Sequence, residues 1–202
     1  MGRAPTNTKQ KLLETATDLV WRESYNAVSV DEICKKAGVK KGSFYHYFPS
    51  KAHLALEAMD VSMQEMKVCY DDIFSSTREP VESFKLMVQH VIDKQKEIEK
   101  ELGHVCGCPF ATLGSELAAQ DEEIGHKIAE ICAKKTRYYE SALRALISKG
   151  LIDDNINVDT KAKEIFSFVV GQLLMARIDN DLDFIENNLE SAVFNLIGVK
   201  EY

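Results

Sequence analysis

The sequence SVDEICKKAGVKKGSFYHYFPSKAHL, residues 29–54, contains the start and stop signals of two short helices. Ser29 and Glu32 have the spacing of a capping box, in which the serine hydroxyl accepts from the Glu32 amide and the glutamate carboxylate accepts from the Ser29 amide. Gly38 follows the next apolar turn and suits the left-handed conformation in which many helices end. The spacing therefore predicts one helix that starts after Ser29 and ends before Gly38.

A second short helix is predicted over residues 41–48, because Pro49 bounds it. Phe44 and Phe48 are one turn apart and lie on one face, which indicates that both rings anchor this helix to the body of the protein. The opposite face is polar or small and consists of Gly42, Ser43, Tyr45 and His46.

The two helices follow an amphipathic segment at Thr8–Ser24, so three helices with a glycine-containing turn predict a helix-turn-helix, a DNA-binding arrangement. Gly42 has no side chain and would let the backbone come close to a base edge or a phosphate. Lys40, Lys41 and Lys51 surround it, which is the local charge that a phosphate backbone attracts.

The composition fits a mostly helical protein and hides a charge asymmetry. The chain has 202 residues, 45% of them hydrophobic, with only 4 Pro and 10 Gly. This composition is typical of a globular domain and excludes a disulfide-stapled miniprotein or a many-stranded fold. The net charge of −7 argues against a nucleic-acid partner, but residues 1–51 carry +4 and the rest −11. A basic head on an acidic body therefore favours two functions for two parts.

The remaining chain predicts further helices from its periodicity and caps, at about 51–74, 80–102, 110–119, 121–149, 159–178 and 182–197. The helix at 159–178 is apolar on nearly all sides, so a second subunit is expected to cover part of it. The sequence contains no phosphate-binding loop, dinucleotide fingerprint or hydrolase nucleophile motif. We therefore expect an all-α protein.

Residues 29–54 resemble the DNA-binding signature of the TetR/AcrR family of transcriptional repressors. The resemblance covers residues 6–66, with the helix-turn-helix at 29–48. It implies about nine helices, a DNA-binding domain at 1–50, an effector-binding and dimerisation domain at 51–202, and a homodimer built on the last two helices. It places Lys41, Gly42, Ser43 and Tyr45 near major-groove bases, Ser29, His46, Tyr47 and Lys51 on phosphates, and Phe44 and Phe48 inside.

The ligand-binding core of such proteins varies freely, so its residues are predicted only from their apolar or aromatic character. The candidates are Met63, Met66, Tyr70, Phe84, Met87, Cys108, Phe110, Tyr138 and Phe168. Each of them is also an ordinary core residue by type, and methionine often fills gaps in cores.

The segment His104–Pro109 has three open interpretations. Its Cys-x-Cys spacing with one histidine offers at most three ligands, one fewer than a structural zinc site needs. Cys108 precedes a predicted helix start, where a thiol becomes more reactive, and the segment resembles an electrophile-sensing branch of the family. A plain turn with inert thiols is the third interpretation. We expect no metal or cofactor.

Two functional hypotheses follow. The first is a dimeric DNA-binding repressor, released from a palindromic operator by a small-molecule or electrophile effector. The second is a helical enzyme or small-molecule carrier whose head only resembles a DNA-binding domain. Five cysteines and a start without an apolar signal region predict a reduced, cytoplasmic protein without a membrane anchor.

Overall fold

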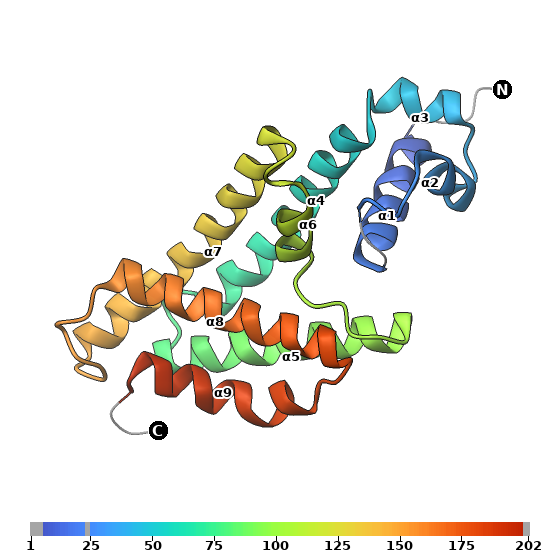
Figure 1. The fold of residues 1–202 in the computed structure, drawn as a ribbon. Coiled ribbons are helices and arrows are strands. Elements are labelled where there is room, and N and C mark those ends of the chain that lie inside the picture. The colour runs from blue at the N-terminus through green and yellow to red at the C-terminus, as the bar shows by residue number, and fades with distance from the viewer. Residues whose placement is uncertain (1–5, 23–24, 200–202) are drawn as a thin grey trace. The chain divides into compact units, whose positions relative to one another are not determined.

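The computed structural model describes residues 6–22 and 25–199, which form nine α-helices and contain no β-strand (Figure 1). The helices are α1 (Thr6–Arg22), α2 (Val30–Ala37), α3 (Lys41–Tyr47), α4 (Lys51–Ile73), α5 (Pro80–Leu102), α6 (Pro109–Leu117), α7 (Glu122–Ser148), α8 (Val158–Asp179) and α9 (Asp183–Ile197). The all-α prediction is confirmed. The predicted end of the first helix, at Ser24, lies outside the described residues.

The described chain divides into two compact units. The first contains residues up to Met66 together with Pro109–Ile128, and the second contains Lys67–Cys108 and the chain from Ala129 onward. The first unit therefore holds α1, α2, α3, α6 and the beginnings of both α4 and α7. The functional boundary expected between residues 50 and 51 stays a prediction.

The start of α2 has the capping box that the sequence predicts. The Ser29 amide donates to the Glu32 carboxylate at 2.7 Å, and the Glu32 amide donates to the Ser29 hydroxyl at 3.2 Å. At the other end Gly38 has φ +67°, the left-handed conformation that glycine adopts without strain. Local signals thus set both ends of α2.

The core of the three-helix head joins α1, α2, α3 and the start of α4. Phe44 and Phe48 are completely buried in it, with ring centroids 5.9 Å apart. Their neighbours in the buried cluster are Leu12, Ala16, Leu19, Val28, Ile33, Cys34 and Leu54. Helix α3 has only seven residues, and a helix of this length is unstable in water by itself, so these two rings hold it in place.

The second unit has α5, α8 and α9 packed together, with α8 and α9 side by side (Figure 1). Its centre includes an aromatic cluster in which Tyr70 and Tyr139 are buried and their hydroxyls lie 3.4 Å apart. Phe74, Phe84 and Tyr138 complete the cluster. Within the described ranges no helix is both long and apolar enough to cross a membrane.

The capping box makes a prediction about pH. Hydrogen bonds from the Ser29 backbone and side chain hold the pKa of Glu32 below its ordinary value. Because the folded-state pKa is the lower one, the stabilisation is present above the ordinary pKa and is lost as pH falls through the lowered value. We expect Glu32→Ala to reduce the free energy of unfolding at about pH 7, and the difference to shrink as pH approaches about 3.

Urea unfolding at successive pH values measures this difference. Glu123→Ala, at an exposed acid in the first turn of α7, is the matched control and lacks a capping box. A Glu32→Ala effect of the same size at every pH would contradict the assignment.

Candidate DNA-binding interface

Helix α3 presents a polar face to solvent because its apolar side is used for packing. Gly42 and His46 are exposed, Tyr45 is 51% exposed, and Ser43 is half-buried. Tyr47 is half-buried, and its ring packs edge-to-face against His46 with centroids 4.8 Å apart. Of the four residues predicted for the outer face of this helix, three are exposed and Ser43 is half-buried.

The lysines around α3 have different surroundings. Lys40 is the exposed N-cap residue of α3. Lys41 is also exposed, but its ammonium lies 2.8 Å from the carboxylate of Asp31 in α2, which raises the pKa of Lys41. Sequence reasoning missed this partner, since ten residues separate the two positions and no helical spacing joins them. Lys41 is thus held over the start of α2.

Lys51 does not lie on the exposed surface of α3. Its ammonium donates to the backbone carbonyls of Tyr25 at 2.7 Å and Val28 at 2.8 Å. It also lies 4.0 Å from the centroid of the Tyr25 ring, within the range of a cation–π interaction. Burial lowers the pKa of Lys51, and the carboxylates of Glu116 and Glu32 act in the opposite direction.

Comparison with known proteins decides the family. Residues 12–58, which include the helix-turn-helix, match the family described as bacterial regulatory proteins, tetR family. Residues 88–192 match the tetracyclin repressor-like C-terminal domain. The chain belongs to the TetR family. Its relatives are named as transcriptional regulators of the helix-turn-helix type, so the chain is a DNA-binding transcriptional regulator.

Relatives of full length support the assignment. The chain is 26% identical over 197 residues to an uncharacterised helix-turn-helix regulator in the lacX 3′ region of Lactococcus lactis subsp. lactis, covering 96% of each chain. It is 25% identical to the uncharacterised regulator YxaF of Bacillus subtilis, covering 87% of each. Among solved structures, a TetR-family regulator from Agrobacterium tumefaciens has a TM-score of 0.85 at 19% identity and covers 95% of this chain and 98% of that one.

The reduced form of NemR from E. coli has a TM-score of 0.82 at 20% identity and covers 96% of this chain and 99% of that one. At these identities the solved structures show the shared fold. They confirm the expectation of an N-terminal helix-turn-helix followed by a helical C-terminal domain.

The residues expected to line a ligand core of this TetR-family chain fall in both units. Tyr70, Phe84 and Met87 are at most 2% exposed and belong to the packed core of the second unit. Tyr138 is half-buried, and its hydroxyl donates to Asp71 at 2.5 Å. Cys108 and Phe168 are half-buried in the second unit, Met63 and Met66 are half-buried in the first, and Phe110 is buried in the first.

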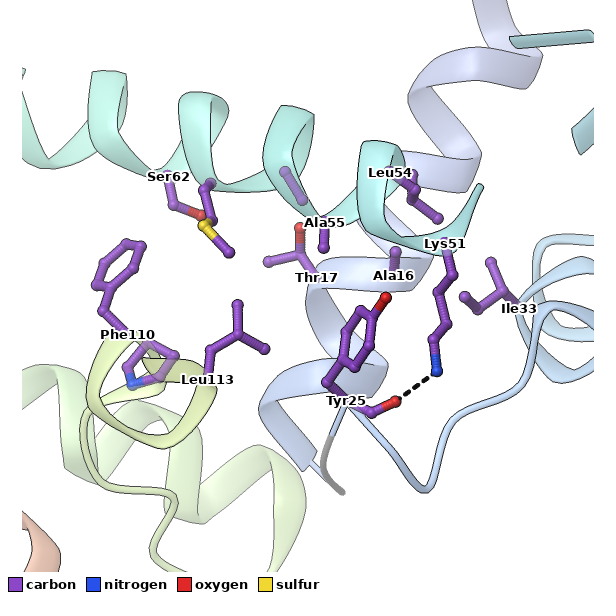
Figure 2. A pocket seen from close by; sticks show the side chains of 13 residues that line it. Ala16, Thr17, Tyr25, Ile33, Lys51, Leu54, Ala55, Ser62, Phe110 and Leu113 are labelled. Atoms are coloured by element: carbon purple, nitrogen blue, oxygen red, sulfur yellow. Dashed lines mark hydrogen bonds between the residues drawn. The ribbon is translucent and has the colours of Figure 1, made fainter. Parts of the chain in front are cut away.

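A narrow apolar cavity of about 30 Å³ lies within the first unit (Figure 2). Helices α1, α4 and α6 contribute most of its walls, with Phe110 and Leu113 facing it from α6. Of the nine predicted ligand residues, only Phe110 lines it. A cavity that holds benzene measures about 150 Å³, so this one has room for one or two waters and is a packing gap.

Of the segment His104–Pro109, residues 104–108 form a firmly held loop of the second unit, and Pro109 begins α6 in the first unit. The buried side chain of Gln95 accepts from the Gly107 amide at 3.0 Å and donates to the Gly107 carbonyl at 3.1 Å. Asn180, at the end of α8, accepts from the Val105 amide at 3.0 Å. Gly107 has φ +72°, and a Cβ there would lie 3.2 Å from the Leu173 carbonyl oxygen, so both conformation and space require glycine.

This loop places two thiols differently. Cys106 is 3% exposed, whereas Cys108 is half-buried beside the first residue of α6. Burial raises the pKa of Cys132 in α7, and the electrostatic interaction with Cys108 raises it further. Burial disfavours the Lys135 ammonium, but Tyr70, Cys108 and Cys132 together raise its pKa above the ordinary value. Cys108 therefore lies within the electrostatic reach of the half-buried Lys135.

Sequence reasoning missed Gln95 and Lys135. Gln95 carries a signal that could have found it, because it follows Val88 and Ile92 in the buried register of α5 and is a polar residue at a core position. Lys135 has no such signal within a long charged helix. Among the described residues no group of three histidine, cysteine or acidic side chains is placed to hold a metal ion.

Proposed function

We propose that this TetR-family chain is a homodimeric repressor that reads a palindromic operator with α3. The observation that carries the proposal is the division of α3 into a buried phenylalanine side and an exposed polar side. The proposed base contacts are Lys41, Gly42, Ser43 and Tyr45, and the proposed phosphate contacts are Ser29, Lys40, His46 and Tyr47. Hydroxyl and ammonium donors on phosphates set the register, and the groove-facing side chains specify the sequence.

Gly42 supports contact with a duplex. A Cβ built at Gly42 would meet no other atom within 4 Å, and its φ is not positive. Neither the packing nor the backbone of the head therefore requires glycine at this position, although glycine weakens a helix by about 1 kcal/mol relative to alanine. Close approach of a DNA duplex to α3 would explain why this position has no side chain.

The charge of the head supports the same interface. Lys35, Lys36, Lys40 and Lys41 are all exposed on or beside α2 and α3. The net charge of +4 over residues 1–51 stands against −11 over the rest of the chain. Phosphate binding is driven by such local charge, so the acidic body does not oppose it.

The proposed dimer uses an apolar face of α8 and α9. Leu174, Met175 and Ile178 in α8 are 52%, 50% and 64% exposed, and Phe184 in α9 is 59% exposed. Gly171 lies one turn before Leu174 and Met175 with nothing near its missing side chain, which allows a second helix to approach closely. Contiguous exposed apolar residues on one element mark an interaction site, and a two-fold axis would let each copy cover the other.

The first experiment is selection of bound sequences from a random DNA pool, for which we expect a palindrome. With that operator, Lys41→Ala combined with Tyr45→Ala should reduce the preference over random duplex by about 2 kcal/mol or more, because each good base contact is worth about 1–3 kcal/mol. Fluorescence anisotropy measures the affinity of each variant for the operator and for random duplex.

Lys94→Ala, at an exposed lysine of α5, is the control. A chain that prefers no sequence would contradict the proposal, and catalytic turnover that these variants abolish would favour the alternative helical enzyme.

For the dimer, Leu174→Glu combined with Ile178→Glu should give a monomer, because each copy would bury two carboxylates against those of the other copy across the two-fold axis. Light scattering after size-exclusion chromatography measures the mass. Val68→Glu is the matched control, since Val68 in α4 is 64% exposed, as Ile178 is. A double variant that remains dimeric would exclude this face.

We further propose that the effector acts on the body of the molecule, and that Cys108 responds to electrophiles such as quinones. The sulfur would add to the β-carbon of the unsaturated carbonyl, and a proton would join the α-carbon. Support comes from the half-buried thiol, the nearby Lys135 cation, and the position of Cys108 directly before α6. A bacterial regulator of transcription must reach chromosomal DNA, so the proposed function would place the chain in the cytoplasm.

Treatment of the operator complex with benzoquinone tests this effector response. We expect release from the natural chain and release about tenfold slower from Cys108→Ser, because the serine hydroxyl is a much weaker nucleophile than a thiolate. Cys69→Ser, at another half-buried thiol of the second unit, should behave as the natural chain does. Equal release from the natural chain and Cys108→Ser would remove Cys108 from the response.

A further inference from the structure

The connection between α1 and α2 is attached to the start of α4 by one side chain. Lys51 is the first residue of α4, and its ammonium turns back to the carbonyl of Tyr25 at 2.7 Å (Figure 2). The same ammonium donates to the carbonyl of Val28 at 2.8 Å. The Tyr25 ring lies against the same cation at 4.0 Å. Two of the three donors of the ammonium are thus used inside the first unit.

These carbonyls belong to the segment that sets the start of α2. Val28 is 1% exposed, and Ser29 after it is the N-cap of α2. Residues 25–28 lie outside any helix, and the Tyr25 and Val28 carbonyls both accept from the Lys51 ammonium. A hydrogen bond to a charged donor is stronger than one to a neutral donor, and burial strengthens it further. Lys51 therefore fixes the position at which the chain enters α2.

Helix α6 holds the same connection from another side. The carboxylate of Glu116 accepts from the backbone amide of Asn26 at 3.3 Å and from its side-chain amide at 3.4 Å. Glu116 also acts electrostatically on Lys51 and favours its charged form. Helix α6 also lies beside the packing gap that it shares with α1 and α4, which Phe110 and Leu113 line.

We propose that Lys51 is a positioning residue for operator binding, which together with Glu116 holds the α1–α2 connection and thereby the orientation of α2 and α3. On this proposal Lys51 makes no phosphate contact, unlike the role that the family pattern implies. The inference rests on the proposed binding of DNA by α3. The proposal implies that a change of charge at Glu116 in α6 alters operator binding although Glu116 itself does not contact DNA.

The salt dependence of operator binding separates the two roles. Each phosphate contact that is lost lowers the slope of log affinity against log salt by about 0.9. We expect Lys51→Met to weaken operator binding about tenfold or more while the slope stays that of the natural chain. Lys40→Met, at an exposed lysine proposed to contact phosphate, is the matched control and should lower the slope by about 0.9.

Glu116→Met is the second variant, and it tests the sign of the effect. Removal of a negative charge near DNA should strengthen binding if only charge matters. If Glu116 positions the head, the same change weakens binding about threefold or more with an unchanged slope. Glu123→Met removes an exposed acid of the same unit and should not weaken binding.

A measurement without DNA completes the test. Amide hydrogen exchange at residues 25–29 of the free protein should be about tenfold faster in Lys51→Met than in the natural chain, and unchanged in Lys40→Met. If Lys51→Met does not fold, Glu116→Met carries the test by the same exchange and binding measurements.

The proposal is overturned if Lys51→Met lowers the slope by about 0.9, leaves operator affinity unchanged, or leaves exchange at residues 25–29 unchanged. It is also overturned if Glu116→Met strengthens binding. All comparisons use an operator that the natural chain binds selectively. Failure to find such an operator would refute the proposed function, whereas the outcomes above refute only the role of Lys51 and Glu116.

Discussion

Burial of Phe44 and Phe48 is the interaction on which the proposed DNA-binding surface depends. A helix of seven residues gains too few internal hydrogen bonds to offset the entropy of forming it, so α3 exists because two aromatic rings on one side enter the core of the head. The same packing turns the other side outward. The exposed positions of Gly42, Tyr45 and His46 follow from where the phenylalanines go, since Phe44 lies on the same short helix and Phe48 directly follows it as the C-cap.

The features that sequence reasoning predicted well are those set by neighbours along the chain. The capping box joins residues three apart, the left-handed glycine ends its own helix, and Phe44 and Phe48 are one turn apart. The later helices also agree with their predicted limits, for example Asp183–Ile197 against the expected 182–197. Periodicity and caps contain this information because they depend on local geometry alone.

The features that it missed join distant residues. Lys51 reaches carbonyls 23 and 26 residues away, and Asn26 meets a carboxylate 90 residues away. An exposed phosphate-binding lysine and a lysine folded back on its own chain look the same in a sequence. The ligand candidates stay predictions for a related reason, because helical spacing shows that Tyr70, Phe84 and Met87 face inward but cannot show whether they line a space or fill it.

The ion pair between Lys41 and Asp31 gives the proposed DNA-binding surface an intramolecular counterion. In the proposed complex a phosphate or a guanine edge must compete with a carboxylate for this ammonium. The Asp31 carboxylate, once released, is an anion beside the DNA and has to recruit a cation from solution. When DNA replaces Asp31 as the partner of Lys41, the release of ions therefore contributes less binding free energy than it does when DNA binds Lys40. Asp31 thus weakens association that depends on charge alone and leaves more of the discrimination to the base edges.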